Sequence, residues 1–346
     1  MITSDTSSMV RVLTPIWERL LDQPAIGAGE NFFDRGGNPA VAIELFADIA
    51  KVTGRELPPT LIFQAPTIMA LSALLEQRSG FQSSPLVLLK PGTEPPIFIA
   101  HGIGGTVLEL FQLARHIDLP NAIYATQAMG IDGTSRPSES IEDMAQLYLN
   151  EIKKVQPDGP YFLIGHSLGG LVAFEMAQRL SAKREQVAQL IMMDSYPHAR
   201  YLSRTLRGRL LCSQVIRRAT EALGSLQRSD RHSSGKPGWT GIYRPPPGAS
   251  FAPAMRRVRE TGQWALERYR PRFYDGRIKF LRAEVVTTFP SDPGPVWGHL
   301  ATEFEVETVP GHHLGMLTTQ FQSSAAVLTR HLRSGLCLQQ SASLAC

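Results

Sequence analysis

The spacing of hydrophobic positions divides the chain into two parts with different periods. Between residues 8 and 78, apolar residues recur every three or four positions, as they do along one face of a helix. The helices predicted from this period cover VRVLTPIWERLLD (10–22), AVAIELFADIAKVTG (40–54) and TIMALSALLEQ (67–77). Helices this short predict a small all-α bundle.

From residue 97 the pattern changes to short apolar runs separated by helical stretches. Runs such as IFIA (97–100), YFLI (161–164) and QLIMM (189–193) have the continuous apolar character of strands that are buried on both faces. Strands that alternate with helices predict a mostly parallel sheet with right-handed crossovers. The alternation stops near residue 198 and resumes at GRIKFLRAE (276–284), and a last helix is expected over 318–334.

The interruption and the two ends of the sheet region complete the predicted organisation. Residues 198–272 contain helical pieces, RLLCSQVIRRATEAL and APAMRRVRETGQWALERY, and are interpreted as a lid inserted into the sheet domain, which spans 97–335. Residues 79–96 are rich in Ser, Pro and Gly and are predicted to be a linker. Residues 336–346 are assigned to a tail.

Charge is distributed unevenly along the 346 residues. The net charge is +4, but residues 200–272 hold sixteen bases against four acids (+12), and residues 1–80 hold six bases against nine acids (−3). The arginines are not interleaved with aromatic residues as in nucleic-acid readers, so no nucleic-acid partner is expected. The alternatives that remain are a solvated basic surface and attraction of an acidic or phosphate-bearing partner.

Cysteine use and hydropathy bear on the compartment. The three cysteines are far apart and lack metal-ligand spacing, which favours a reducing environment. No apolar run approaches the roughly 20 residues that span a bilayer, and the N-terminus lacks a signal-peptide pattern. A cytoplasmic location without a membrane contact is the expectation.

The clearest chemical motif is GHSLGG, residues 165–170. It follows an apolar strand and precedes a helix, which is the context of the G-x-S-x-G nucleophile elbow of α/β-hydrolases. Gly165 and Gly169 suit a turn with no room for Cβ atoms. Ser167 is therefore the candidate nucleophile, and it needs a base because a hydroxyl alone is weakly nucleophilic.

The candidate base and acid follow in the chain order of this fold, Ser, then Asp or Glu, then His. His313, in VPGHHLGML after the last strand, is the preferred base, and His312 is interpreted as its loop neighbour. Asp194 ends the strand after the nucleophile and is the favoured acid, with Glu284 at the end of a later strand as the alternative. No third ligand accompanies the two histidines, so no metal site is predicted.

A glycine-rich segment, HGIGGT (101–106), ends the first predicted strand. It lacks the spacing of a phosphate-binding loop, and beside an elbow serine it is interpreted as an oxyanion loop. The backbone N–H groups of Ile103 and Leu168 are the predicted donors to the tetrahedral oxyanion.

Taken together, these motifs resemble the terminal carrier–thioesterase pair of nonribosomal peptide and polyketide synthases. The thioesterase part of the resemblance is carried by PIFIAHGIGGTVLELFQLARHI, SIEDMAQLYLNEIKKVQPDGPYFLIGHSLGGLVAFEMAQRL, LIMMDSYP, YRPRFYDGRIKFLRA and VPGHHLGML. It implies an α/β-hydrolase fold with a helical lid, and it supports Asp194 as the acid.

The N-terminal part resembles a peptidyl carrier domain, through VRVLTPIWERLLD, ENFFDRGGNPAVAIELFADI and GRELPPTLIFQAPTIMALSALL. Carriers of this family have Gly-Gly-x-Ser, and the serine takes a phosphopantetheine arm. Here the motif is Gly36-Gly37-Asn38-Pro39, with no Ser or Thr between residues 36 and 52. The resemblance therefore implies a pseudo-carrier whose helix start is kept by Asn38 and Pro39.

The resulting hypothesis is a thioesterase of secondary-metabolite biosynthesis. It would release an acyl, peptidyl or polyketide chain by hydrolysis or cyclisation, with no cofactor on this chain. The thioester would arrive on the phosphopantetheine of a separate carrier or synthase module, or on coenzyme A. The alternatives are a carboxylesterase-like serine hydrolase and a non-catalytic docking module of a synthase.

Overall fold

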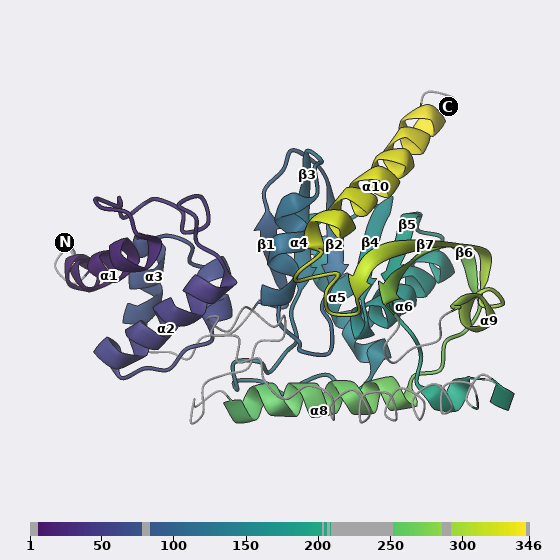
Figure 1. The fold of residues 1–346 in the computed structure, drawn as a ribbon, viewed down its shortest axis with the longest axis horizontal. Helices are drawn as coiled ribbons and strands as arrows, with labels where there is room; N and C mark the ends of the chain where they lie inside the picture. The colour runs from purple at the N-terminus through teal and green to yellow at the C-terminus, as the bar shows by residue number, and fades with distance from the viewer. Residues whose placement is uncertain are drawn as a thin grey trace, which may run out of the picture.

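The computed structural model describes residues 6–77, 84–202, 204, 205, 208, 252–285 and 292–343 (Figure 1). The N-terminal bundle contains α1 (Thr6–Leu21), α2 (Pro39–Thr53), the 3-10 helix η1 (Pro59–Phe63) and α3 (Ile68–Glu76). Its apolar faces meet in a core of their own, around Leu13, Trp17, Phe32, Leu45 and Ile49, all fully buried. The predicted all-α bundle is confirmed.

The start of α2 is stabilised by the two residues that stand where a carrier has its attachment motif. Asn38 is the N-cap, and its Oδ1 accepts hydrogen bonds from the backbone N–H groups of Ala40 (3.0 Å) and Val41 (3.2 Å). Pro39 occupies the first helical position, where its missing N–H costs nothing. The helix therefore begins well without a hydroxyl side chain at position 39.

The C-terminal domain is built on a seven-stranded sheet with the order β1-β3-β2-β4-β5-β6-β7. All neighbouring strands pair in parallel except β1 and β3, which are antiparallel. The strands are β1 (Leu86–Lys90), β2 (Glu94–Ala100), β3 (Asn121–Thr126), β4 (Tyr161–His166), β5 (Val187–Met193), β6 (Tyr274–Val285) and β7 (Ala301–His312). The mostly parallel α/β fold predicted from the sequence is confirmed.

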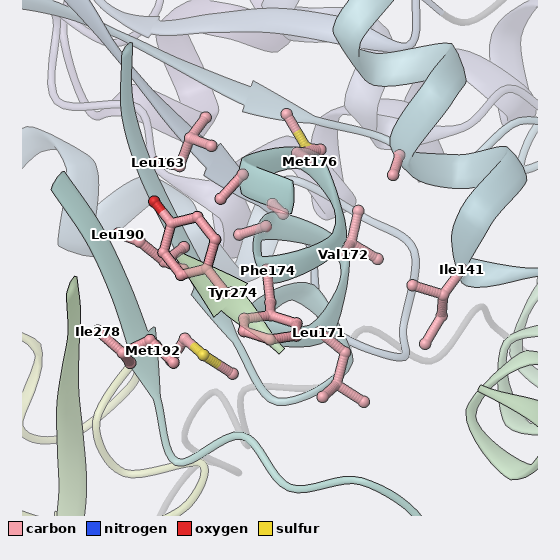
Figure 2. Close-up of a cluster of buried hydrophobic side chains, with 14 of the residues drawn as sticks. Ile141, Leu163, Leu171, Val172, Phe174, Met176, Leu190, Met192, Tyr274 and Ile278 are labelled. Atoms are coloured by element: carbon pink, nitrogen blue, oxygen red, sulfur yellow. The ribbon is translucent and has the colours of Figure 1, made fainter. Parts of the chain in front are cut away.

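Helices cover both faces of this sheet because the central strands are apolar on both sides. The 3-10 helix η2 (Leu108–Leu110), α4 (Phe111–His116) and α10 (Phe321–Ser343) share one core with side chains such as Phe162 and Ile164. On the other face, α5 (Ile141–Val155) and α6 (Leu168–Ala182) pack on alternate residues such as Leu163. Figure 2 shows this second core, with the ring of Phe174 of α6 beside Tyr274 of β6 and near Met192 of β5.

The described part of the lid has one long helix. Between β5 and β6 the structure describes the 3-10 helix η3 (Ala199–Tyr201) and α8 (Ala252–Arg268), and a short helix α9 (Gly294–Trp297) lies between β6 and β7. The second lid helix predicted from the sequence, residues 209–223, lies outside the described residues. Figure 1 shows α8 running along the edge of the hydrolase domain toward the N-terminal bundle.

Two predicted boundaries differ from the structure. The segment 79–96 was assigned to a linker, but Leu86–Lys90 within it form β1, because they pair with β3 at the edge of the sheet. The last helix was expected to end at 334 and to be followed by a tail, but α10 continues to Ser343. In the described part of the chain, no helix combines the length and apolar character needed to cross a membrane.

Candidate active site

The elbow serine stands at the carboxyl end of the central strand, between β4 and α6. Ser167 has φ 57° and ψ −123°, a conformation that few L-residues adopt and that a nucleophile elbow requires. A Cβ on Gly165 would lie 2.1 Å from the carbonyl oxygen of Gly169, and one on Gly169 would lie 2.2 Å from that of Ala100. Both positions therefore require glycine because the backbone of a neighbouring segment lies too close for a Cβ atom. This is the reason for which the sequence motif was expected to contain them.

A carboxylate and an imidazole meet beside this turn. Asp194 directly follows β5, is 5% exposed, and its Oδ2 accepts a hydrogen bond of 2.8 Å from Nδ1–H of His313. Its backbone N–H donates to Leu281 O (2.8 Å), and Oδ1 accepts from Ala283 N–H (3.4 Å), so β6 holds the carboxylate in place. When Nδ1 of a neutral His313 donates to the carboxylate, Nε2 is the ring nitrogen that carries the basic lone pair.

His166 joins this pair to the serine turn. Its ring lies 4.4 Å from the ring of His313, centroid to centroid, and its Nε2–H donates to the backbone carbonyl of His313 at 2.8 Å. Burial and the neighbouring His313 hold the pKa of His166 well below its ordinary value, so this residue is neutral at pH 7. The imidazole of His313 is therefore held against the residue that precedes Ser167.

The alternatives weighed from the sequence lie elsewhere. Glu284, near the end of β6, is exposed. The carboxylate that contacts His313 is that of Asp194. His312 is exposed at the end of β7, and its Nδ1 accepts from the N–H of Gly315 at 3.2 Å. Among the described residues, no group of three potential metal ligands comes together.

The two predicted oxyanion donors belong to one narrow crevice. Ile103 and Leu168 line a space of about 10 Å³ together with Ala128 and with Val258 and Gly262 of the lid helix α8. This volume holds about one water molecule. A Cβ on Gly262 would lie 3.4 Å from Leu168 Cδ2 and 3.7 Å from Ile103 Cγ1, so α8 packs against the side chains of both predicted donor residues.

A buried histidine fixes the loop that carries Ile103. His101 donates from Nδ1 to the carbonyl of Gly102 (2.7 Å), and its Nε2 accepts from the hydroxyl of Tyr148 (2.5 Å). Burial lowers the pKa of His101 to about 4, so the ring is neutral at pH 7 and one nitrogen is free to accept. In the sequence, His101 and His166 stand out only by their position at the ends of apolar runs, and nothing in it predicts their contacts.

The sheet, the elbow serine at the end of its central strand and the helical insertion over that end define an α/β-hydrolase. Residues 95–232 match the family described as "Thioesterase domain", and residues 11–75 match the family described as "Phosphopantetheine attachment site". The chain therefore consists of a domain of the phosphopantetheine-attachment family followed by a domain of the thioesterase family, in the order that the resemblance implied.

Similar proteins agree with this family. The chain is 37% identical over 191 residues to a dimodular nonribosomal peptide synthase of Bacillus subtilis, covering 54% of this chain and 8% of that protein. It is 31% identical over 277 residues to malpibaldin synthetase of Mortierella alpina, covering 78% of this chain and 5% of that protein. The chain therefore spans less than a tenth of the length of either relative.

Two solved structures share the fold, one over nearly the whole chain and one over about seven tenths of it. A four-domain nonribosomal peptide synthetase, solved in its holo form with AMP and glycine, has a TM-score of 0.60 and 22% identity, covering 95% of this chain and 26% of that one. The NocB thioesterase domain, solved in covalent complex with a fluorophosphonate analogue of nocardicin G, has a TM-score of 0.53 and 22% identity, covering 71% and 99%. At this identity the likeness concerns the fold.

Proposed function

We propose that this chain releases an acyl, peptidyl or polyketide group from a thioester through an ester on Ser167. His313 takes the hydroxyl proton as Ser167 Oγ attacks the thioester carbonyl, and Asp194 stabilises the imidazolium that results. The imidazolium then protonates the departing thiolate sulfur. Water, or a hydroxyl or amine of the same acyl chain, attacks the ester in the second step and releases an acid or a ring.

One observation supports this proposal most strongly. The hydrogen bond of 2.8 Å from His313 Nδ1 to Asp194 Oδ2 joins two side chains 119 positions apart, next to a serine in elbow geometry. A buried carboxylate that orients an imidazole is the arrangement that general-base activation of a serine requires. The backbone N–H groups of Ile103 and Leu168 are the proposed oxyanion donors, each contributing roughly 3–4 kcal/mol to transition-state stabilisation.

The thioester is proposed to arrive from outside this chain. The N-terminal domain belongs to the phosphopantetheine-attachment family, but Pro39 stands where the serine is expected, and no hydroxyl lies between residues 36 and 52. The arm then belongs to a separate carrier, to a synthase module or to coenzyme A. The exposed arginines of α8, Arg256 and Arg257, suit either donor, because both bring negative charge. The cysteine pattern favours a cytoplasmic setting for this reaction.

Intact-protein mass spectrometry tests the proposed chemistry directly. Incubation with acyl-pantetheine thioesters is expected to add the mass of one acyl group at Ser167. The Ser167→Ala variant is expected to gain no mass and to lose on the order of 10⁴-fold in kcat, as in triad knockouts of other hydrolases. An acyl adduct that persists in Ser167→Ala contradicts the assignment of the nucleophile.

Two other functions are separated by the same assay. A carboxylesterase-like hydrolase would turn over p-nitrophenyl esters much faster than acyl-pantetheine thioesters. A non-catalytic docking module of a synthase would form no acyl adduct with any thioester. The carrier-family domain favours the thioesterase over the esterase, because an esterase of free substrates has no use for a carrier.

A further inference from the structure

The N-terminal bundle packs against the hydrolase domain through three phenylalanines. Phe33 stacks on Phe63 of η1 with 4.9 Å between centroids, and Phe111 of α4 lies 4.6 Å from Phe33 and 5.7 Å from Phe63. At the edge of this cluster, Asp34 pairs with Arg115 of α4 at 3.6 Å. Aromatic contacts at these separations contribute beyond the area that they bury, so the two domains meet at a defined surface.

A second contact joins the bundle to the lid. Ile43 of α2 and Phe63 pack against a buried apolar cluster of the hydrolase domain, which consists of Leu108, Ala128, Ile131, Met255 and Val258. Met255 and Val258 belong to α8, and Leu108 follows the oxyanion loop. The bundle therefore packs against a cluster to which both the lid helix and the segment after the oxyanion loop contribute.

This contact lies at the crevice that holds the predicted oxyanion donors. Ala128 and Val258 belong to the apolar cluster and also line the crevice with Ile103 and Leu168. On α2, Ile43 comes four residues after Pro39, and residues at this spacing share one face of a helix. Pro39 itself is buried. The face of α2 that would carry an arm is thus the face turned to the hydrolase domain.

We propose that the N-terminal domain, which has no phosphopantetheine arm, occupies the surface beside the active site where a carrier docks. A carrier that bears an arm must displace this domain before it can deliver its thioester. This inference rests on the proposed function, because only a thioesterase supplied by a separate carrier needs that surface to be free. Six residues, 78–83, separate the described parts of the two domains. A tether this short keeps the occupant at an effective concentration on the order of mM, far above that of a dilute carrier.

Coverage of position 39 is tested without any enzyme assay. In a Pro39→Cys variant, the rate of maleimide labelling at residue 39 reports how often the bundle leaves the surface, and peptide mapping separates this thiol from Cys212, Cys337 and Cys346. Adding Ile43→Asp is expected to accelerate labelling by about tenfold or more, because it places a charge in an apolar contact. Adding Val52→Asp, on the 56% exposed residue near the other end of α2, is the matched control and is expected to leave the rate unchanged.

A second variant, at an exposed residue, separates loss of the contact between the domains from misfolding of the bundle. Asp34→Lys reverses the charge that faces Arg115 and alters an exposed side chain, so it should accelerate labelling while leaving the bundle folded. Circular dichroism checks the helix content of each variant. Equal labelling rates for Pro39→Cys alone and with Ile43→Asp or Asp34→Lys would overturn the inference.

The consequence for substrate delivery is measured separately, in chains with Pro39 in place. Octanoyl-pantetheine is offered free and attached to a phosphopantetheinylated carrier domain. Ile43→Asp and Asp34→Lys are expected to raise kcat/KM for the carrier-borne thioester about tenfold or more and to change kcat/KM for the free thioester less than twofold. A carrier-borne rate that stays at the wild-type value, while both thioesters still acylate Ser167, overturns the competition. Absence of acylation from either thioester refutes the proposed function, and the labelling result then decides the occupancy.

Discussion

Asp194 holds its carboxylate through an unusual backbone rather than through a long side chain. Its φ is +46°, in the left-handed region that aspartate tolerates better than most residues. The backbone N–H donates to Leu281 of β6, and Oδ2 of the carboxylate accepts from His313. A glutamate at a strand end would reach as far only with more rotamer freedom, so the geometry favours the shorter acid.

Replacing this acid separates its role from that of Glu284. Asp194→Asn puts an amide N–H or a carbonyl against His313 Nδ1 and removes the charge that stabilises the imidazolium. We expect kcat for acyl-pantetheine hydrolysis to fall about 10⁴-fold, as for the corresponding change in another serine triad. Glu284→Gln, on an exposed side chain, is the matched control and should retain full activity. The opposite ranking of the two variants would assign the acid to Glu284.

The neutral state of His101 predicts a pH dependence of stability. Its folded pKa of about 4 lies below the ordinary 6.5, so the unfolded chain binds more protons in this range. The stability that His101 contributes is therefore complete above pH 6.5 and is lost as the pH falls toward 4. Between pH 7.5 and pH 5 this group should lower the free energy of unfolding by about 2 kcal/mol.

Urea unfolding at the two pH values checks this expectation. His101→Asn keeps a donor for the carbonyl of Gly102 and removes the titrating group, so its loss of stability on acidification should be smaller than that of the wild type by about 2 kcal/mol. His299→Asn, at an exposed histidine, is the control. Equal acid sensitivity of the wild type and His101→Asn would show that His101 is not kept neutral by burial.

At the scale of elements, the lid helix α8 sets the room above the predicted oxyanion site. Gly262 faces the side chains of Ile103 and Leu168, and its missing side chain leaves room for their close packing against this helix. An added Cβ would lie in ordinary van der Waals contact, but a branched side chain would have to push α8 away or fill the crevice. The helix α8 and the oxyanion loop therefore line opposite parts of the same crevice.

The effect of substituting Gly262 on catalysis should grow with the size of the new side chain. Gly262→Ala is expected to be tolerated, with a gain of up to about 1 kcal/mol in helix stability. Gly262→Val is expected to lower kcat/KM for acyl-pantetheine at least about tenfold, since it disturbs the donors of the oxyanion. Gln263→Val, the exposed neighbour on the same helix, should have little effect on steady-state rates. Equal kcat/KM in the valine and alanine variants of Gly262 would show that α8 moves clear of the site in solution.

The elements that the sequence predicted well are those whose signal is local. Central strands such as β4 are buried on both faces, so each appears as an apolar run, and the proposal of Asp194 as the acid rests on its position after such a run. The strand before His313, β7, is largely exposed and carries several glutamates, so its signal is weaker. β1 was missed because Ser, Pro and Gly flank its short apolar run, LVLL, and because its pairing partner, β3, lies more than 30 positions away. The contact between His166 and His313 depends on how the loop after β7 folds back, which no local pattern encodes.

At the scale of the whole molecule, the two domains have separate apolar cores joined by a small shared surface. The core residues of the bundle belong to a cluster of their own, and Phe63 is the side chain that packs against this cluster and against two clusters of the hydrolase domain. Each domain should therefore unfold largely independently of the other, and the contact among Phe33, Phe63 and Phe111 couples the two transitions.

A core substitution in each domain tests this independence. Leu45→Ala, in the fully buried core of the bundle, should lower the stability of that domain by about 2–5 kcal/mol and shift one of two calorimetric transitions. Leu163→Ala, on β4, should shift the other. Hydrolysis of free acyl-pantetheine should be unchanged in Leu45→Ala at 25 °C. A common shift of both transitions in either variant would instead show that the chain unfolds as one cooperative unit.

The Asn38–Pro39 helix start also bears on how this domain can change over generations. Every proline codon becomes a serine codon by a single base substitution, and the cap supplied by Asn38 would remain in place after that change. The start of the helix would therefore tolerate a serine at position 39 with little loss of stability. If the proposed pseudo-carrier is correct, one mutational step would restore a hydroxyl at position 39, and the burial of residue 39 would be the remaining obstacle to modification.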